Sequence, residues 1–247
     1  MLRNSYQIFS LFGIPIKLDF SLIILVIWMW VDFGFARGLF AAVTLLAAIV
    51  LHELGHSLVA QRMGCHVREI TLLLIGGRAM LDHIPRKPWQ EMLVALAGPA
   101  VSAALGLVSL LSLPYVHIVF GSKIANWVLW HCMYLNFALC VFNLLPAFPM
   151  DGGRVLRAAL AHITGYVNAT RIAMIVGRSI AVLMAIYALW PKPQHEYMLL
   201  LVAIFVFSAS GQEYQMVLRE ASWQRPWWQQ PGPPDDQVHI SPPPYKR

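Results

Sequence analysis

The sequence predicts a polytopic α-helical membrane protein, with about six transmembrane helices and a small membrane-associated β segment near residues 5–18 and 64–80. Of the 247 residues, 58% are hydrophobic and only 12% are charged, and the mean hydropathy is +0.61. A soluble domain carries about twice that charged fraction. Several apolar runs approach the roughly 20 residues that a helix needs to cross a bilayer. The composition therefore excludes an ordinary soluble domain.

The N-terminal stretch predicts short β structure followed by a first membrane helix. Residues 6–11 and 14–18 are expected to form strands or an interfacial segment, because Gly13 and Pro15 break any helix. Residues 20–35 are apolar enough for the first span. This span lacks a basic segment followed by a small-residue cleavage site, so we expect a retained helix rather than a signal peptide.

Residues 64–80 interrupt the helical pattern. Val, Ile and Leu between residues 67 and 75 favour strands, and the Gly76-Gly77 pair is predicted to turn the chain. One interpretation is an extended segment that offers its edge, along residues 72–75, to an unwound peptide. The alternative is a membrane-embedded hairpin that only plugs the helix bundle. The other spans are expected at residues 39–63, 89–113, 125–145, 172–190 and 197–210.

A metal-ligand motif lies inside the second predicted span. His52 and His56 are four residues apart, so on a helix both imidazoles leave one face and can hold one metal ion. The carboxylate of Glu53, next to His52, can reach a water at the metal without being a ligand. Arg62 ends the span ten residues after His52, which places the motif roughly 15 Å deep. Ionisable groups at such depth persist mainly along pathways and in active sites.

A catalytic zinc usually has three protein ligands, so one more is needed. Asp151 is the best candidate, because it follows the fourth span in a stretch rich in Pro and Gly, on the same predicted side of the membrane. Glu69, Asp82 and Glu91 are rivals through proximity in sequence alone. The alternative role for Asp151 is to cap the N-terminus of the short helix that follows it.

These motifs together resemble the site-2 protease family of intramembrane zinc metalloproteases. The resemblance rests on HELGH at residues 52–56 and on NLLPAFPMDGGR at residues 143–154, and it covers roughly residues 10–190. The run ALAGP at residues 95–99 and the Gly76-Gly77 pair resemble further motifs of the family. Ser102 stands where an Asn often follows the Gly-Pro. Too few residues lie outside the predicted spans for the PDZ and CBS domains that many members carry, so a minimal catalytic core is expected.

The resemblance implies a single Zn²⁺ held by His52, His56 and Asp151, with Glu53 activating water for cleavage of a membrane-spanning substrate. It also implies that Asn143 helps to hold the substrate peptide or the oxyanion. Further substrate contacts are expected at Gly76, Gly77 and Pro146.

The charge distribution predicts orientation and partners. If the N-terminus lies in the cytoplasm, only three of the 18 Lys and Arg residues lie on the outer side of the membrane: Arg37, Lys123 and Lys192. The positive-inside rule then favours both termini in the cytoplasm, in a bacterial or archaeal plasma membrane. The net charge of +6 therefore needs no nucleic acid partner. The expected partners are the bilayer and a single-pass or signal-anchor membrane-protein substrate, and the oligomeric state is left open.

Residues 1–212 are expected to form the catalytic core and residues 213–247 a disordered cytoplasmic tail rich in Trp and Pro. A metal transporter is the alternative function, because intramembrane His and Asp residues also line ion paths. A catalytically silent binding scaffold is a third. His131-Cys132 and Cys65-His66 are weaker metal candidates. We expect His131 to form a hydrogen bond to a neighbouring helix instead, and Cys65-His66 to lie in a loop.

Overall fold

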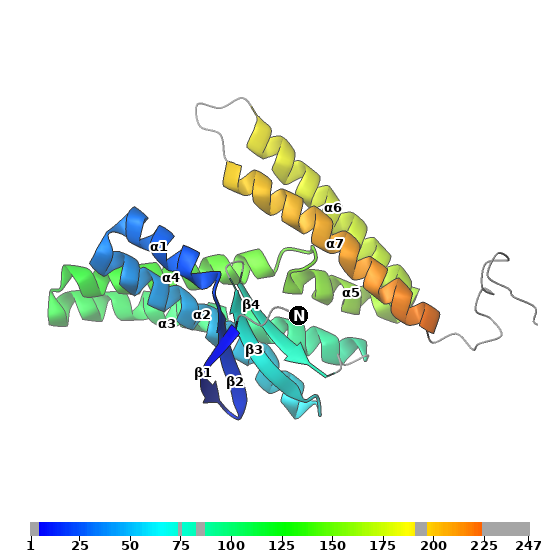
Figure 1. The fold of residues 1–247 in the computed structure, drawn as a ribbon, viewed down its shortest axis with the longest axis horizontal. Coiled ribbons are helices and arrows are strands. Elements are labelled where there is room, and N and C mark those ends of the chain that lie inside the picture. The colour runs from blue at the N-terminus through cyan, green and yellow to red at the C-terminus, as the bar shows by residue number, and fades with distance from the viewer. Residues whose placement is uncertain (1–4, 74–75, 83–86, 191–196, 224–247) are drawn as a thin grey trace, which may run out of the picture.

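The computed structural model describes residues 5–73, 76–82, 87–190 and 197–223, which form helices around a small sheet (Figure 1). The elements in chain order are β1 (Ser5–Leu11), β2 (Ile14–Asp19), α1 (Leu22–Phe33), α2 (Phe35–Arg62), β3 (Val67–Leu73), β4 (Gly76–Leu81), α3 (Pro88–Phe120), α4 (Lys123–Asn143), α5 (Asp151–Thr164), α6 (Tyr166–Leu189) and α7 (Tyr197–Trp223). The predicted class, a helical membrane protein with a small β segment, is confirmed.

The first predicted span differs from the other five. Helices α2, α3, α4, α6 and α7 are long and apolar enough to cross a membrane. Helix α1 has only 12 residues, so it rises about 18 Å, against a hydrocarbon thickness of about 30 Å. Gly34, with φ near +77°, ends α1 and turns the chain into α2, at the break expected between the first two apolar runs. The position of the break is therefore as predicted, but the helix before it is too short to be a span.

The four strands form one sheet in the order β1-β2-β3-β4. β2 and β3 run parallel, because the α1–α2 hairpin connects them, while the two outer pairs are antiparallel. Two details of the prediction were wrong. Gly76 and Gly77 lie within β4, opposite Leu73 and Leu72, rather than forming the turn. Leu72 and Leu73 are in the inner strand β3, so the edge on this side of the sheet is β4, and β1 is the edge on the other side. Residues 74–75 lie outside the described residues.

The core of the N-terminal half joins the sheet to α1 and α2. Ile14 and Ile16 from β2 and Ile70 from β3 are fully buried against these helices. Gly38 allows α1 and α2 to meet closely, since a Cβ there would stand 2.7 Å from the Cα of Trp30. This tight hairpin fixes α2, the helix that carries HELGH.

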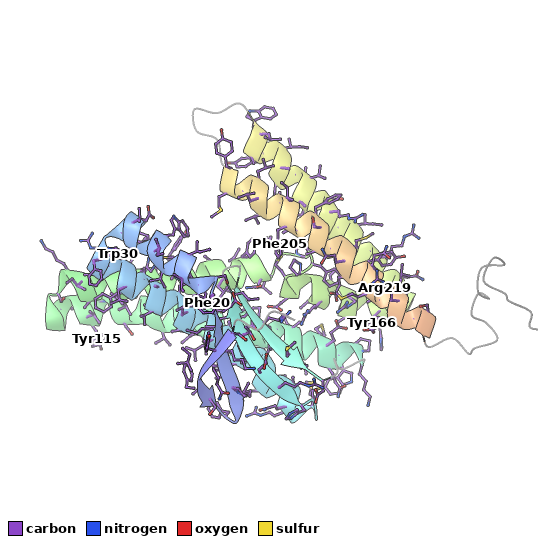
Figure 2. The ribbon with its side chains drawn as sticks, viewed as in Figure 1. Phe20, Trp30, Tyr115, Tyr166, Phe205 and Arg219 are labelled. Atoms are coloured by element: carbon purple, nitrogen blue, oxygen red, sulfur yellow. The ribbon has the colours of Figure 1, made fainter. Side chains whose placement is uncertain are left out.

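The C-terminal half is built on a pair of helices. α6 and α7 pack along each other, and α5 packs on both α6 and α3, so α5 connects the pair to the rest of the fold (Figure 1). Figure 2 shows the side chains that cover this pair, including those of Tyr166, Phe205 and Arg219. α7 continues past residue 212 to Trp223, so the expected boundary between core and tail falls inside a helix. Residues 224–247 lie outside the described part of the chain.

Candidate metal centre

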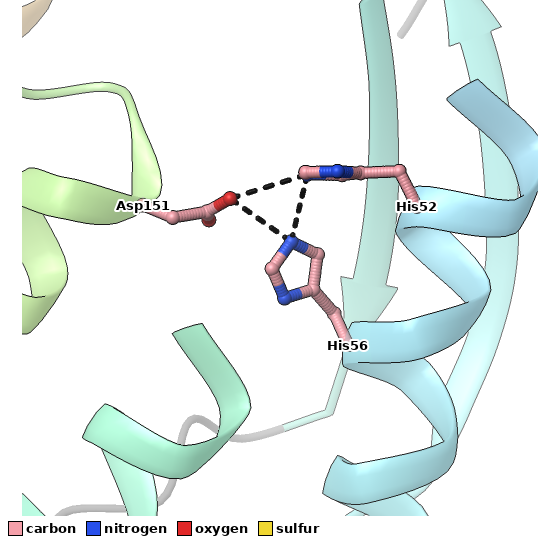
Figure 3. Close-up of side chains that lie close together, drawn as sticks. All are labelled: His52, His56 and Asp151. Carbon is pink, nitrogen blue, oxygen red and sulfur yellow. Dashed lines mark hydrogen bonds and ion pairs between the residues drawn. The ribbon is translucent and has the colours of Figure 1, made fainter. Parts of the chain in front are cut away.

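The two histidines of HELGH project from one face of α2 toward Asp151, the first residue of α5 (Figure 3). His52 Nε2 lies 3.2 Å from His56 Nε2 and 3.2 Å from Asp151 Oδ2. His56 Nε2 lies 3.1 Å from the same Asp151 oxygen. The three residues are 3%, 9% and 7% exposed, so three polar atoms converge in a nearly dry place.

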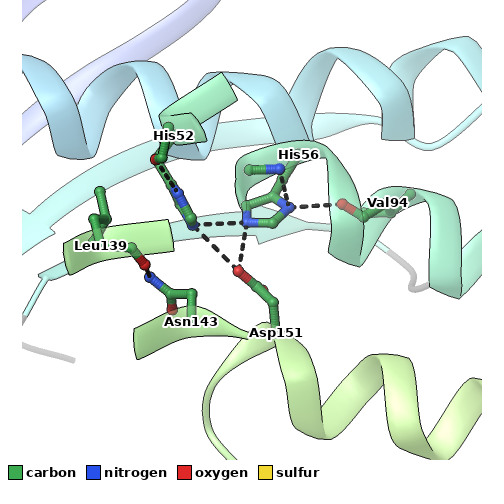
Figure 4. Close-up of polar contacts among 8 residues, drawn as sticks. His52, His56, Val94, Leu139, Asn143 and Asp151 are labelled. Carbon is green, nitrogen blue, oxygen red and sulfur yellow. Dashed lines mark hydrogen bonds and ion pairs between the residues drawn. The ribbon is translucent and has the colours of Figure 1, made fainter. Parts of the chain in front are cut away.

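The outer ring nitrogens of both histidines are engaged by α3 (Figure 4). His56 Nδ1 lies 2.7 Å from the carbonyl oxygen of Val94, which can only accept a hydrogen bond. In its neutral form His56 therefore carries its proton on Nδ1, which leaves a lone pair on Nε2. The backbone N–H of Gly98 also approaches this Nδ1, but at the longer distance of 3.3 Å. His52 Nδ1 lies 2.9 Å from the hydroxyl of the fully buried Ser102, which can accept the same kind of bond. Both Nε2 atoms then face Asp151 as electron-pair donors.

This donor set fits a zinc ion. The two Nε2 lone pairs and the Asp151 carboxylate oxygen would repel one another if no proton lay between them. A cation bound by all three removes that repulsion. In a tetrahedral site with bonds of about 2.0–2.2 Å, neighbouring ligand atoms stand about 3.3–3.5 Å apart. The three distances here, 3.1–3.2 Å, lie close to that range. In the part of the chain that the structure describes, this is the one cluster of three metal-ligating side chains.

Gly98 gives the histidines their space. A Cβ at Gly98 would stand 2.7 Å from His52 Nε2 and closer still to His56 Nε2. Gly98 and Ser102 are four residues apart, so they lie on the same face of α3, the face turned to HELGH. The small residues of α3 therefore do more than permit helix packing: one makes room for the imidazoles and one binds His52.

The loop between α4 and α5, residues 144–150, places Asp151. The backbone oxygens of Leu144 and Leu145 lie so close to Gly152 that a side chain there would collide with them. Met150 is the N-cap of α5 and Asp151 is its first residue, so the capping role considered for Asp151 is not the one it has. Its side chain points to the histidines instead.

Helices α6 and α7 contact this loop and hold it in place. Ser210 of α7 donates a hydrogen bond of 2.9 Å to the carbonyl oxygen of Phe148. Gly177 of α6 lets the backbone of Ala147 approach, since a Cβ there would be 3.1 Å from the Ala147 Cα and 2.8 Å from Ser210 Oγ. The C-terminal helix pair thus sets the position of the loop that leads into Asp151, the first residue of α5.

Arg157 ties α5 to two other helices. It is 1% exposed, and it donates 2.8 Å hydrogen bonds to Glu91 of α3 and to Glu213 of α7. Its guanidinium also lies 4.9 Å from the ring centroids of Phe148 and Tyr166. Burial alone would lower the pKa of Arg157, but the neighbouring Glu91 and Glu213 carboxylates raise it. The ion pairs hold α5, and hence Asp151, against α3.

Glu53 lies beside the cluster without joining it. It is half-buried, and Gly77 of β4 passes over it so closely that a Cβ at Gly77 would be 2.9 Å from Glu53 Cδ. Asn143, at the end of α4, donates one hydrogen bond of 2.9 Å to Leu139 within its own helix, which leaves its second N–H free to act elsewhere. Pro146 is exposed on the loop.

The rival carboxylates have other partners. Glu69 pairs with Lys17, Asp82 with Arg68, and Glu91 with Arg157, so none of them belongs to the cluster. His131 stacks on Trp127 with the ring centroids 4.9 Å apart, and its buried Nε2 has no hydrogen-bond partner among the described residues, so the hydrogen bond expected to a neighbouring helix is not formed by this atom.

The sequence alone did not assign roles to Gly98, Ser102, Arg157 or Gly177. For Gly98 and Ser102 a signal existed, because two small residues four apart follow the ALAGP run on one helix face. For Arg157 and Gly177 no local pattern could have shown the main partners. Glu91 is 66 residues from Arg157 in the chain, and the loop and helix that approach Gly177 are also distant in sequence.

The comparisons with known proteins agree with this geometry. The model of peptidase family M50 matches residues 40–128 and 115–187, more than half of the chain. The chain belongs to peptidase family M50. As a member of this family with five membrane-length helices, it is a multi-span integral membrane protein.

Individual members of family M50 align over most of the chain. It is 39% identical to zinc metalloprotease MJ0392 of Methanocaldococcus jannaschii over 223 residues, covering 87% of this chain and 62% of that protein. It is 38% identical to the Synechocystis protein sll0528 over 182 residues, covering 68% of this chain and 47% of that protein. The chain thus spans less than two thirds of the length of either relative.

The fold also matches a solved structure. The site-2 protease from Methanocaldococcus jannaschii superposes with a TM-score of 0.63 at 36% identity, covering 85% of this chain and 95% of that one. The match supports the arrangement of membrane helices and the small sheet as the architecture of this family.

Proposed function

We propose that this protein is a zinc-dependent intramembrane endopeptidase that cuts membrane-protein substrates in or near their transmembrane segments. The observation that carries the proposal is the convergence of His52, His56 and Asp151 as electron-pair donors directly beside Glu53. Membership of family M50 supports it. A transporter would need polar groups distributed along a path, whereas these groups gather at one point beside a carboxylate that is not a ligand.

In this proposal His52, His56 and Asp151 hold one zinc ion and Glu53 handles the proton. When bound, the zinc polarises the scissile carbonyl and makes water acidic enough to ionise near neutral pH. Glu53 takes the proton from the attacking water and delivers it to the leaving amine. Val94 and Ser102 keep both imidazoles in the tautomer that presents Nε2.

The sheet suggests where the substrate lies. A transmembrane helix must unwind locally before a peptide bond can be cut, because its carbonyls are bonded within the helix. β4 is an edge strand, so its free backbone groups can pair with an extended peptide. Gly77 of β4 contacts Glu53, so a peptide added along Gly76–Leu81 would pass next to the proposed base. The free N–H of Asn143 and the exposed Pro146 are the proposed contacts on the other side.

The charge distribution supports a cytoplasmic location for both termini, and with it a metal centre nearer the cytoplasmic side. Arg62 ends α2 ten residues beyond His52. The proposed host is a prokaryotic plasma membrane, and the proposed substrate is a single-pass or signal-anchor protein. Fusing a reporter that is active only in the cytoplasm to each end of the chain tests the orientation.

The decisive experiment compares Glu53→Gln with Asp32→Asn, the same loss of charge at an exposed residue outside the centre. Zinc content is measured on the purified proteins, and new N-termini are mapped in membranes that contain each form. We expect all forms to keep zinc, and Glu53→Gln to lose the new N-termini within transmembrane segments. Equal cleavage by the two variants would contradict the role of Glu53, and a wild-type protein without zinc would contradict the metal centre.

A further inference from the structure

A cavity lies between α6 and α7, and none of the metal-centre residues lines it. Its volume is about 630 Å³, and its walls include Arg178 from α6 and Gln212, Gln215 and Arg219 from α7. No Asp or Glu of the described chain lines it. Two arginines without a carboxylate make the cavity strongly positive, so it suits an anion.

Arg178 has no counter-ion among the described residues, although it lies in an apolar membrane-length helix. Its Nε is shielded from solvent and has no hydrogen-bond partner in the described part of the chain. The guanidinium rests 4.7 Å from the ring centroid of Phe207. Arg157 shows the contrast, because its buried guanidinium is met by two carboxylates. Charged groups in membrane helices are costly, so a cation without a partner indicates a ligand.

Gly211 of α7 leaves space for the Arg178 guanidinium. A Cβ at Gly211 would stand 3.3 Å from the Arg178 Cζ and closer to its terminal nitrogen, so only glycine leaves the guanidinium where it is. From Gly211 one face of α7 continues through Gln215 to Arg219, at intervals of four residues. This face leads from the guanidinium toward the C-terminal end of the helix.

The depth of the cavity matches the headgroup region of a membrane. α7 has 27 residues and is about 40 Å long, which exceeds the hydrocarbon thickness of about 30 Å. Its last turns, with Arg219, therefore reach the headgroups. Arg178 lies at the level of Gly211, about 12 Å deeper, and its long side chain can extend toward the same anion as Arg219.

We propose that the cavity between α6 and α7 binds the phosphate of an anionic phospholipid headgroup. Arg178 and Arg219 supply the charge, and Gln212 and Gln215 supply further hydrogen-bond donors. Basic pockets between membrane helices on the cytoplasmic side are suited to such headgroups. The deep position of Arg178 favours a lipid over free phosphate, since a lipid phosphate is delivered along the membrane.

The test is lipid retention by the full chain, measured by native mass spectrometry with phosphatidylglycerol, with phosphatidylcholine and with inorganic phosphate. We expect one phosphatidylglycerol per chain and no comparable binding of phosphatidylcholine. Arg178→Gln should weaken phosphatidylglycerol binding at least about tenfold, as expected for loss of a charged hydrogen-bond donor. Arg171→Gln is the matched control, because Arg171 is exposed on α6 and does not line the cavity.

Two further variants keep the test decisive if Arg178→Gln fails to fold. Arg219→Gln removes the exposed cation, and Gly211→Ala displaces the Arg178 guanidinium without changing any charge. Both should weaken binding while Arg171→Gln does not. Equal retention by all variants, or equal retention of phosphatidylcholine, would overturn the proposal. Displacement of the lipid by millimolar inorganic phosphate would show that the site takes the free anion, and would overturn the lipid assignment.

Discussion

Replacing Gly98 by Ala is the sharpest test of the metal centre, because it adds one methyl group and removes no ligand. The new Cβ would stand 2.7 Å from His52 Nε2, whereas ordinary contact begins at 3.4 Å. The imidazole must therefore move by at least about 0.7 Å, several times the roughly 0.2 Å that metal–ligand distances tolerate. We expect zinc affinity to fall at least about 100-fold, the upper end of the cost of losing an outer-shell partner.

The assay is zinc bound per chain after dialysis against chelators of graded affinity. Gly106→Ala is the control: it makes the same substitution in the same helix, and its Cβ would meet only the ring of Phe137, at 3.0 Å. Both changes raise helix propensity equally, by up to about 1 kcal/mol. If Gly98→Ala held zinc as tightly as wild type and Gly106→Ala, the convergence of the two imidazoles on one ion would be refuted.

Three other predictions follow from the surroundings of the centre. Ser102→Ala removes the hydrogen-bond partner of His52 and should lower zinc affinity about 10–100-fold, measured by chelator competition, whereas Ser102→Thr should retain most of it. Gly77→Val should displace the Glu53 side chain, so that proteolysis falls while bound zinc stays at one per chain. Loss of zinc would show instead that the larger side chain on β4 displaces the metal ligands. Arg157→Met leaves Glu91 buried without its partner, so it should lower the free energy of unfolding by about 3–5 kcal/mol. The loss is measured as a lower midpoint of thermal unfolding by circular dichroism, and an unchanged midpoint would mean that the ion pairs do not hold α5.

The sequence was sufficient for features that depend on local spacing. Hydropathy indicated the membrane helices, because burying about 20 apolar residues in lipid depends on composition more than on neighbours. The interval between His52 and His56 determined their common helix face. Gly and Pro in NLLPAFPMDGGR indicated a bent loop that could bring Asp151 near them, and the structure places the three together.

Errors arose where a pattern had two local solutions. Gly76 and Gly77 fit a turn as well as a strand, and the choice was decided by pairing with Leu72 and Leu73. Residues 20–35 were expected to span the membrane, yet the helix formed there, α1, has only 12 residues. That β4 rather than β3 is an edge strand depended on strand order, which is a property of the whole sheet.

By itself the sequence determined the class of protein and the helix face that His52 and His56 share, since both follow from residue type and periodicity, and it gave Asp151 as the best candidate for a third donor. Only the tertiary structure decided which atoms support them: the carbonyl of Val94, the hydroxyl of Ser102, and the space at Gly98 and Gly77. These partners come from other helices and strands, where the distance in sequence carries no information about the distance in space. A metal centre needs positions fixed to tenths of an ångström, and that precision comes from packing.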